Sequence, residues 1–503
     1  MSTYVTHRRI IGAHKPPRAS NTWTEKILSL LLVAALICLG VACVIALLQV
    51  LQPSDSATTL PVRLDPKASQ QKTESAAAAD TRVDPAAASS TSSAVMESAA
   101  RAGAVTALDS EPSAEELARY RKAARVLDPE VMQHVPDTFD SGVKNPCWTN
   151  SSGAFRCLPY FYVTGMFHAG ATSISEKLRL HPDVLTDACT GCQFWGEEGK
   201  PMSFYLEHMR EAPNAIKQAP ATKVLMDSSA STFAFYWAAG GKAHRGYAEA
   251  MRPCYQSCVE GFNVHKVPVA DCMTAKCFNA SLTADVKRAT EAGVDWDTEA
   301  HNPLLVRAVY GDRPPKMILV ARDPIARLYS AYHGYPHYHG KYGKSSSGFT
   351  AYVAEQVGAL RTCEADFGAA RCALYFEALS HREEMVYFHA DQLMRGMYAL
   401  FLEIWYRFIP ASNWLIIHSD DLFSQPRETL ARVVTFLNIT RPDDATLDRM
   451  AAAGQMKSFT AGQEPVEPRA RQLLAELYAP YNSKLAKLTG DARFEKWNEQ
   501  PVQ

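Results

Sequence analysis

The chain has 503 residues, of which 47% are hydrophobic and 21% charged, a composition typical of a globular protein. Its formal net charge of −1 excludes the bulk positive field that attracts nucleic acid, although a local basic cleft remains compatible with it. We therefore expect no nucleic-acid partner. By length alone, the chain has room for two or three domains.

The N-terminal region predicts a membrane anchor. Residues 27–48 carry no charged side chain over 22 positions, and a helix of that length spans roughly 33 Å, enough to cross a hydrocarbon core of about 30 Å. Residues 1–26 are rich in Lys and Arg, which predicts a cytosolic tail and a single-pass type II topology. A cleaved signal peptide is the alternative, but its apolar core normally has only about 7–15 residues.

Residues 49–125 predict a stalk that is mostly disordered. No aromatic residue occurs between Trp23 and Tyr120, and a segment of this kind cannot bury enough apolar surface to offset the entropy of the chain. A capping-box pattern near the end of the stalk predicts a helix over 114–127. We expect a single lumenal domain over 126–500.

Within this domain, short apolar runs alternate with helical patterns. Apolar runs without alternation suit parallel strands covered on both faces, so the pattern predicts an α/β fold with a P-loop-like parallel sheet flanked by helices. A ligand would bind at the carboxyl ends of the strands. The strand candidates are 160–165, 223–227, 316–321 and 414–418, and the helix candidates are 171–180, 324–333, 391–408, 425–437 and 468–488.

Ten of the twelve cysteines follow the apolar segment, and an even number there is typical of an oxidising lumen. Residues 254–277 hold four cysteines whose spacing suits zinc, but two disulfides that clamp a helical hairpin are favoured. The other candidate pairs are Cys147–Cys157, Cys363–Cys372 and Cys189–Cys192, the last of which could instead pair elsewhere. Sequons compatible with N-glycosylation lie at Asn150, Asn279 and Asn438.

The first candidate phosphate site is the segment 160–173, YFYVTGMFHAGATS, which predicts a strand, a glycine-rich turn and a helix. Gly165, Gly170 and Thr172 have the spacing of the pattern G-x-x-x-x-G-K-(S/T), but Ala171 stands at the lysine position. Backbone N–H groups of such a turn can bind phosphate or sulfate oxygens together with the following helix N-terminus. A strand–helix turn without a ligand is the alternative.

The second candidate site is the segment 316–330, KMILVARDPIARLYS. Arg322 directly follows the strand, at the end where ligands bind, and its guanidinium can hold a phosphate bidentately. Ser330 lies roughly two turns along the next helix. Taken alone, Arg322 could equally form a salt bridge and Ser330 could lie on the helix surface. Together, the two segments predict a nucleotide with phosphates at both ends.

The two motifs resemble those of the Golgi carbohydrate sulfotransferases that use 3′-phosphoadenosine 5′-phosphosulfate (PAPS), closest to the N-acetylgalactosamine 4-sulfate 6-O-sulfotransferase type. The family's 3′-phosphate motif, roughly R-(D/N)-P-x-x-R-x-Y-S, is matched by 322–330, and its 5′-phosphosulfate loop, roughly P-K-x-G-T-T, corresponds to 167–172. The resemblance covers about 145–497. Further likenesses lie at 145–148, 179–182, 227–232, 396–398, 436–438 and 478–482.

The resemblance implies transfer of a sulfuryl group from PAPS to a carbohydrate hydroxyl, possibly of a sulfated glycosaminoglycan-like chain, by an enzyme in the Golgi membrane with a lumenal catalytic domain. Residues 228–232 would line the cleft, and Trp195 would contact a ligand or pack in the core. The implied ligands of the 5′-phosphosulfate are His168, Ala169, Gly170, Ala171, Thr172 and Ser173, and those of the 3′-phosphate are Arg322 and Ser330.

Two positions depart from the family pattern. His168 replaces the loop lysine, which contacts the bridging and leaving-group oxygens, and a histidine could serve there if the nucleotide favours its protonation. The family segment K-E-x-x-(F/Y)-(F/W), whose glutamate is the expected general base, corresponds to 190–195, where lysine and glutamate are missing. The candidate replacement bases are Glu197 and Glu198, and further Asp187 and Asp227.

Two function classes therefore stay open. One is an active sulfotransferase with a rearranged site, and the other is a catalytically inactive relative that binds nucleotide or glycan as a scaffold. A P-loop kinase or NTPase is disfavoured, because the lysine that contacts the β- and γ-phosphates is missing.

Overall fold

The computed structural model describes residues 111–186, 191–196, 199–235, 241–386, 391–454 and 458–499. The predicted tail and anchor, and the stalk up to residue 110, lie outside these ranges. Among the helices that the structure describes, none has both the length and the apolar character needed to cross a membrane.

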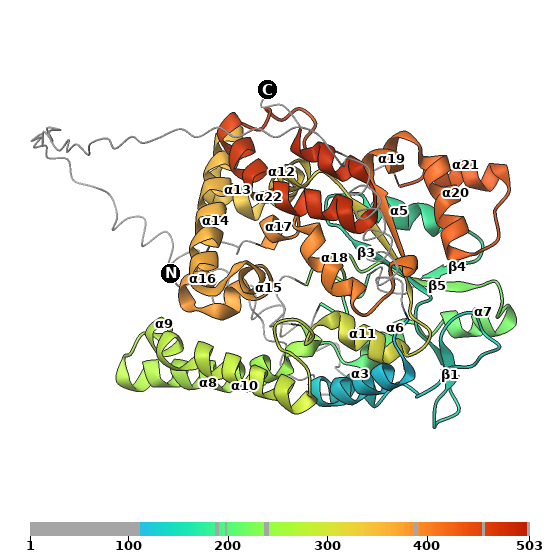
Figure 1. Cartoon of the computed structure of the whole chain (residues 1–503), viewed down its shortest axis with the longest axis horizontal. Helices are drawn as coiled ribbons and strands as arrows, with labels where there is room; N and C mark the ends of the chain where they lie inside the picture. Colours follow the sequence, from blue (N-terminus) through green and yellow to red (C-terminus); the bar gives the residue numbers. More distant parts are fainter. Residues whose placement is uncertain are drawn as a thin grey trace, which may run out of the picture. The chain divides into compact units, whose positions relative to one another are not determined.

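A five-stranded parallel sheet forms the centre of the fold, with the strand order β4-β5-β3-β6-β7 (Figure 1). Almost every residue of β3, β5 and β6 is buried, as expected for strands covered on both faces. The predicted parallel sheet is thus confirmed. The strands are β3 (Phe161–Gly165), β4 (Val184–Thr186), β5 (Val224–Asp227), β6 (Lys316–Ala321) and β7 (Trp414–His418).

The strand order places β3 at a topological switch point. From β3 the chain runs to β4 and β5 on one side of the sheet, and then crosses to β6 and β7 on the other. Because all five strands are parallel, the loops that follow β3 and β6 emerge at the same edge, where ligands of open α/β sheets bind. Strand β4 was missed from the sequence because three residues are too few for a recognisable apolar run.

Helices surround this sheet, and most predicted helices are found within a few residues of their expected ends. They are α3 (Ala114–Leu127), α4 (Pro129–Met132), α5 (Ala171–Leu178), α6 (Met202–His208), α7 (Ala212–Gln218), α8 (Arg245–His265), α9 (Val269–Cys272), α10 (Phe278–Ala292), α11 (Asn302–Tyr310), α12 (Pro324–Gly334), α13 (His337–Tyr342), α14 (Ser346–Phe367), α15 (Ala369–Leu379), α16 (His381–Glu384), α17 (Asp391–Met394), α18 (Tyr398–Tyr406), α19 (Ser419–Ser424), α20 (Pro426–Leu437), α21 (Asp444–Ala452) and α22 (Pro468–Thr489).

The helix expected over 391–408 is wrong as a continuous element, because the structure divides it into α17 and α18. The Tyr478 hydroxyl of α22 donates to the Leu393 carbonyl at 2.7 Å, and the Gly396 amide closes a tight turn onto the same carbonyl. A Cβ atom on Gly396 would lie 2.7 Å from the Tyr478 ring. The packing of α22 therefore holds the break in place.

Helix α3 joins the main core. Its N-terminus carries the expected capping box between Ser113 and Glu116, and Tyr120 and Leu127 are buried with the sheet residues. Residues 114–125, which the sequence analysis assigned to the stalk, are thus part of the folded structure.

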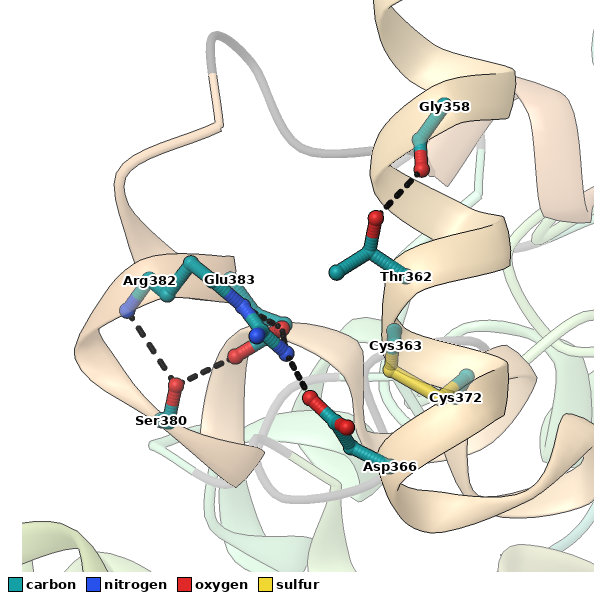
Figure 2. The surroundings of a disulfide bond; sticks show 8 residues. All are labelled: Gly358, Thr362, Cys363, Asp366, Cys372, Ser380, Arg382 and Glu383. Carbon is teal, nitrogen blue, oxygen red and sulfur yellow. Dashed lines mark hydrogen bonds and ion pairs between the residues drawn. A yellow bond between two sulfur atoms is a disulfide. The ribbon is translucent and has the colours of Figure 1, made fainter. Parts of the chain in front are cut away.

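Four disulfides between described residues brace three local units. Cys147–Cys157 joins β1 (Cys147–Thr149) to β2 (Phe155–Cys157), and Cys363–Cys372 joins α14 to α15 (Figure 2). The four cysteines of the α8–α10 hairpin form the bonds Cys254–Cys277 and Cys258–Cys272, around a small core of their own. Cys254, Cys258 and Cys277 are the one group in the described chain with metal-binding proximity, and all three are oxidised, so the favoured disulfide interpretation is confirmed.

Candidate functional site

The first motif leaves the sheet at the end of β3. The Met166 amide donates to the Val320 carbonyl at 3.0 Å, which extends the pairing of β3 with β6 into the loop. Gly165 has φ 149°, and a Cβ atom there would lie 3.0 Å from the Ala230 carbonyl oxygen. A glycine is needed at this position because the loops that follow β3 and β5 almost touch.

Helix α5 begins at the end of this loop. Gly170 precedes it at φ 116°, and its carbonyl accepts the first helical hydrogen bond, from Ile174 at 3.0 Å. The amides of the first turn have no partner within the helix, and the helix dipole makes this end positive. The expected anion-binding geometry of a strand, a turn and a helix N-terminus is therefore present.

The second motif leaves the sheet at the end of β6. The Asp323 carboxylate caps α12 by accepting the amides of Ile325 at 2.7 Å and Ala326 at 3.1 Å. The Tyr398 hydroxyl donates to the Arg322 carbonyl at 2.9 Å. These contacts fix the backbone of Arg322 at the edge of the sheet.

The structure brings the two motifs together. The Arg322 guanidinium donates to the His168 carbonyl at 3.1 Å, and the His168 Nδ1 atom lies 3.2 Å from the Ser330 Oγ atom. Ser330, on the second turn of α12, is 4% exposed. Three residues that the sequence analysis assigned to two phosphate sites therefore form one hydrogen-bonded constellation.

The ring of His168 lies against α12. It meets the Tyr335 ring edge-on at 4.9 Å and the Phe459 ring at 5.3 Å between centroids. A Cβ atom on Gly334 would lie only 2.3 Å from the His168 Cε1 atom. Gly334 thus makes room for the imidazole, a role that the sequence analysis missed because nothing local to Gly334 indicates it.

The positive charge of the site resides on arginines. Burial lowers the pKa of Arg322, and the nearby Arg327 lowers it further. Burial, together with Arg327 and Arg322, lowers the pKa of His168 to about 4, so this imidazole is neutral at pH 7. The expected protonated His168 therefore requires an anion beside it.

The sequence analysis did not assign two further arginines, Arg327 and Arg395, to the site. Arg327 is fully buried, and its guanidinium donates to both the side chain and the carbonyl of Gln392. The Arg395 guanidinium lies 4.7 Å from the centre of the Phe167 ring, one residue before His168. A signal was present for Arg327, which occupies the second arginine of the 322–330 motif, but Arg395 is brought near only by tertiary packing.

The remaining residues of the loop differ in their exposure. Ala169 and Ala171 are buried, Thr172 is exposed, and Ser173 is buried. The Ser173 hydroxyl donates to the Gly454 carbonyl at 2.6 Å. In this structure Ser173 therefore braces α5 rather than offering a free donor.

Comparison with known proteins places this site in context. Residues 298–467, about a third of the chain, match the family model described as a sulfotransferase domain, and this segment includes Arg322 and Ser330 but not the loop at 165–173. The findings support a sulfotransferase family. The parallel sheet flanked by helices agrees with a sulfotransferase fold.

The chain is also similar to individual curated proteins. It is 24% identical over 344 residues to mouse carbohydrate sulfotransferase 15, covering 67% of this chain and 54% of that protein. To the human protein of the same name it is 23% identical over 368 residues, covering 71% of this chain and 59% of that protein. The matched region thus spans little more than half of these relatives.

A solved structure is similar over a comparable share of the chain. The sulfotransferase from Alicyclobacillus acidocaldarius matches 66% of this chain and 96% of its own, at 14% identity. Its TM-score is 0.32, which is too low to support an argument about the fold.

The segment that the sequence analysis compared with the family's glutamate segment packs onto the loop after β5. The Gln193 amide donates to the Ser229 hydroxyl at 2.9 Å, and its side-chain oxygen accepts the Ser231 amide at 3.0 Å. Gly191 stands at the glutamate position, with φ 98° and with its Cβ position 3.0 Å from the Ser228 carbonyl oxygen. A side chain there would be strained.

Of the four candidate replacement bases, only Asp227 is among the described residues. Glu197, Glu198 and Asp187 lie outside the described residues. Asp227 is fully buried, and its carboxylate accepts the Tyr205 hydroxyl at 2.6 Å and the Ser229 amide at 2.7 Å. These donors tie Asp227 to the structural network beneath the site.

Trp195 belongs to the same network. It is fully buried, its indole N–H donates to the Tyr162 hydroxyl at 3.2 Å, and its carbonyl accepts from Asn302 at 2.7 Å. Of the two interpretations left open by the sequence, core packing is the one that the structure shows.

Proposed function

We propose that this chain transfers a sulfuryl group from PAPS to a hydroxyl of a carbohydrate. The observation that carries the proposal is the contact of Arg322 and Ser330 with His168, at the carboxyl edge of a parallel sheet. The match to a sulfotransferase domain and the similarity to carbohydrate sulfotransferase 15 support it.

The residues present fit a nucleotide with phosphate groups at both ends. Burial lowers the pKa of Arg322 even though Asp323 and Asp420 act to raise it, so a phosphate would relieve the remaining cost of its desolvated charge. We assign the 3′-phosphate to Arg322 and Ser330. We assign the 5′-phosphosulfate to the loop from His168 to Thr172 and to the first-turn amides of α5, without the Ser173 hydroxyl, which is hydrogen-bonded to Gly454.

Sulfuryl transfer asks the protein for positioning, charge stabilisation and proton removal. PAPS supplies the sulfuryl group, whose bond to the 5′-phosphate oxygen breaks as the acceptor hydroxyl oxygen bonds to sulfur. We propose that His168, once a phosphosulfate raises its pKa, donates a hydrogen bond to the departing oxygen. Glu197 or Glu198 would take the proton of the hydroxyl, a role typically worth a factor of about 10²–10⁴.

The proposed setting of the reaction rests on the sequence and its family resemblance. We propose a Golgi membrane protein of type II, anchored by residues 27–48, with the domain in the lumen. The proposed acceptor is a sulfated glycosaminoglycan-like chain, as in the N-acetylgalactosamine 4-sulfate 6-O-sulfotransferase type.

The test is calorimetric binding of 3′-phosphoadenosine 5′-phosphate to the full-length chain in detergent. We expect micromolar affinity that falls at least about tenfold in Arg322→Ala, because a bidentate contact to phosphate is lost. Arg210→Ala, an exposed arginine just after α6, is the control. Unchanged affinity in Arg322→Ala would overturn the proposed site.

A second function, a scaffold that binds nucleotide without turnover, is favoured by one observation. The position of the family's glutamate holds a glycine at φ 98°, where a side chain would be strained, and the loop histidine is neutral. Transfer of radiolabelled sulfate from PAPS to a panel of glycosaminoglycans separates the two functions. Nucleotide binding without transfer to any acceptor would support the scaffold.

A further inference from the structure

A second site lies at the opposite edge of the sheet. Here a cavity of about 630 Å³ opens beside the starts of β3, β5 and β6. Strand β6 has six residues, so about 20 Å separate its Lys316 from Arg322 at the far end. The lining residues are Ser141, Gly142, Val143, Lys144, Pro146, Tyr160, Ala221, Tyr310, Arg313, Pro314, Pro315, Lys316 and Asn438.

The charged side chains of this cavity all carry the same sign. Lys144, Arg313 and Lys316 line it, and no carboxylate is among the described lining residues. Burial lowers the pKa of both lysines, as it does for a cation without full compensation.

Backbone carbonyls, which are neutral, accept from these cations. Arg313 donates to the carbonyls of Asp140 at 2.9 Å, Val143 at 2.6 Å and Lys144 at 2.9 Å. Lys144 donates to the Asn438 carbonyl, and Lys316 lies 3.5 Å from the Ser412 carbonyl. These bonds hold the three side chains in place without cancelling their charge.

The carboxylates that raise the pKa of the two lysines are engaged elsewhere. Asp183 raises the pKa of Lys144, but its carboxylate lies 3.6 Å from the ammonium of Lys223. Glu111 raises the pKa of Lys316, but it forms an ion pair with Arg307 at 2.5 Å. The cavity therefore keeps an excess of positive charge that suits an anion.

The remaining walls suit a sugar rather than a bare ion. The Tyr160 ring lies 5.1 Å from the Lys144 ammonium, so an aromatic face and a cation stand side by side. Three prolines and the exposed Ala221 and Asn438 complete the lining. A volume of this size falls within the range of small-molecule sites.

We propose that this cavity binds a sulfated saccharide, as an anchoring subsite separate from the reaction centre. The anionic class of the ligand follows from the cavity alone, whereas the choice of a saccharide rests on the proposed function. A chain long enough to reach both edges of the sheet would bind with two-point avidity. A saccharide too short to reach both edges cannot bind with two-point avidity, so its affinity reports on single sites.

The test uses a fluorescent chondroitin sulfate tetrasaccharide and the full-length chain, with affinity measured by anisotropy. We expect Lys144→Gln/Lys316→Gln to weaken binding at least about tenfold. Lys287→Gln, an exposed lysine of α10, is the matched control. Arg322→Ala should bind the tetrasaccharide normally while losing 3′-phosphoadenosine 5′-phosphate, so the two proposals fail separately.

Two further measurements keep the proposal open to refutation. Ala221→Trp should also weaken binding, because it fills the cavity without changing charge, and its nucleotide binding reports whether it is folded. Inorganic sulfate, at a concentration that supplies the same negative charge as the tetrasaccharide, should displace the tetrasaccharide poorly. Wild-type affinity in both cavity variants, or equal competition by sulfate, would overturn the saccharide site.

Discussion

The guanidinium of Arg322 donates a hydrogen bond to the carbonyl of His168 at 3.1 Å, across 154 positions of sequence. The contact exists because β3 and β6 are adjacent and parallel, so that the loops after both strands leave the sheet at one edge. It orients the loop that we assign to the phosphosulfate by means of the residue that we assign to the 3′-phosphate. A change at either residue is therefore expected to affect both ends of the nucleotide.

Acid should destabilise the protein through His168. Its folded pKa of about 4 lies below the ordinary value of 6.5, so the unfolded chain takes up the proton first and stability falls as the pH drops from about 6.5 to 4. We expect the unfolding free energy of His168→Asn to fall about 1–3 kcal/mol less than that of the wild-type protein over this pH range. Urea unfolding of the wild-type protein and of His168→Asn at pH 7.5 and pH 5 measures this difference. The contributions of other buried histidines cancel, because both proteins contain them. Parallel pH profiles would contradict the pKa.

A lysine at position 168 tests the chemistry of the loop. If the departing oxygen needs a permanent cation, His168→Lys should raise the turnover of labelled PAPS about tenfold, since lysine is charged over the whole working range. His168→Gln, which can donate a hydrogen bond without charge, is the control. Equal turnover in the lysine and glutamine variants would remove the loop cation from the mechanism.

Restoring the family's glutamate at position 191 should fail. Gly191 has φ 98°, and its Cβ position touches the Ser228 carbonyl, so any side chain there is strained. We expect Gly191→Glu and Gly191→Ala to lose a similar 1–3 kcal/mol of stability, roughly, with no gain in turnover for the glutamate. Thermal unfolding and the sulfate-transfer assay give the two readings. A large gain in turnover confined to Gly191→Glu would show that the loop rearranges around a carboxylate.

Much of the arrangement of strands and helices could be predicted, because the sequence patterns that indicate it are local. The strands at 316–321 and 414–418 are continuous apolar runs between polar neighbours, and the structure has them at the same residues. Arg322 and Ser330 were assigned from one sequence motif. The spacing of its residues alone indicates where the strand ends, where the helix begins and how far along the helix Ser330 lies. The meeting of Arg322 and Ser330 with His168 needed only the additional rule that parallel strands end at one edge.

The parts that sequence analysis missed depend on distant segments. The break between α17 and α18 is held by Tyr478, which lies about 80 residues further along the chain. Gly334 is needed because the His168 ring packs against it, and Arg395 reaches the site only through the Phe167 ring. The cavity beside the starts of β3, β5 and β6 combines residues from five separated segments of the chain, so no local sequence pattern indicates it.

The disulfide between α14 and α15 should matter far more than the ion pairs around it. Cys363 and Cys372 are fully buried and close a loop of nine residues, for which chain entropy predicts about 2–3 kcal/mol. Beside them, Arg382 of α16 pairs with Asp366 at 2.8 Å, but both side chains are about half exposed and a surface pair contributes at most about 1 kcal/mol (Figure 2). We expect Cys363→Ala/Cys372→Ala to lower the unfolding free energy by about 2–3 kcal/mol.

Asp366→Ala is the matched comparison for this corner, with an expected loss of roughly 0–1 kcal/mol, because it removes only the exposed pair and leaves Arg382 bonded to the buried Glu383. Urea unfolding at low and high salt distinguishes the two contributions, because salt screens the ion pair and leaves the covalent bond unaffected. Nucleotide affinity should stay unchanged in both variants, since the expected ligands lie on β3, α5, β6 and α12. A loss in Asp366→Ala that equals the loss in the cysteine variant would mean that the charge network, rather than the covalent link, holds α14 and α15 together.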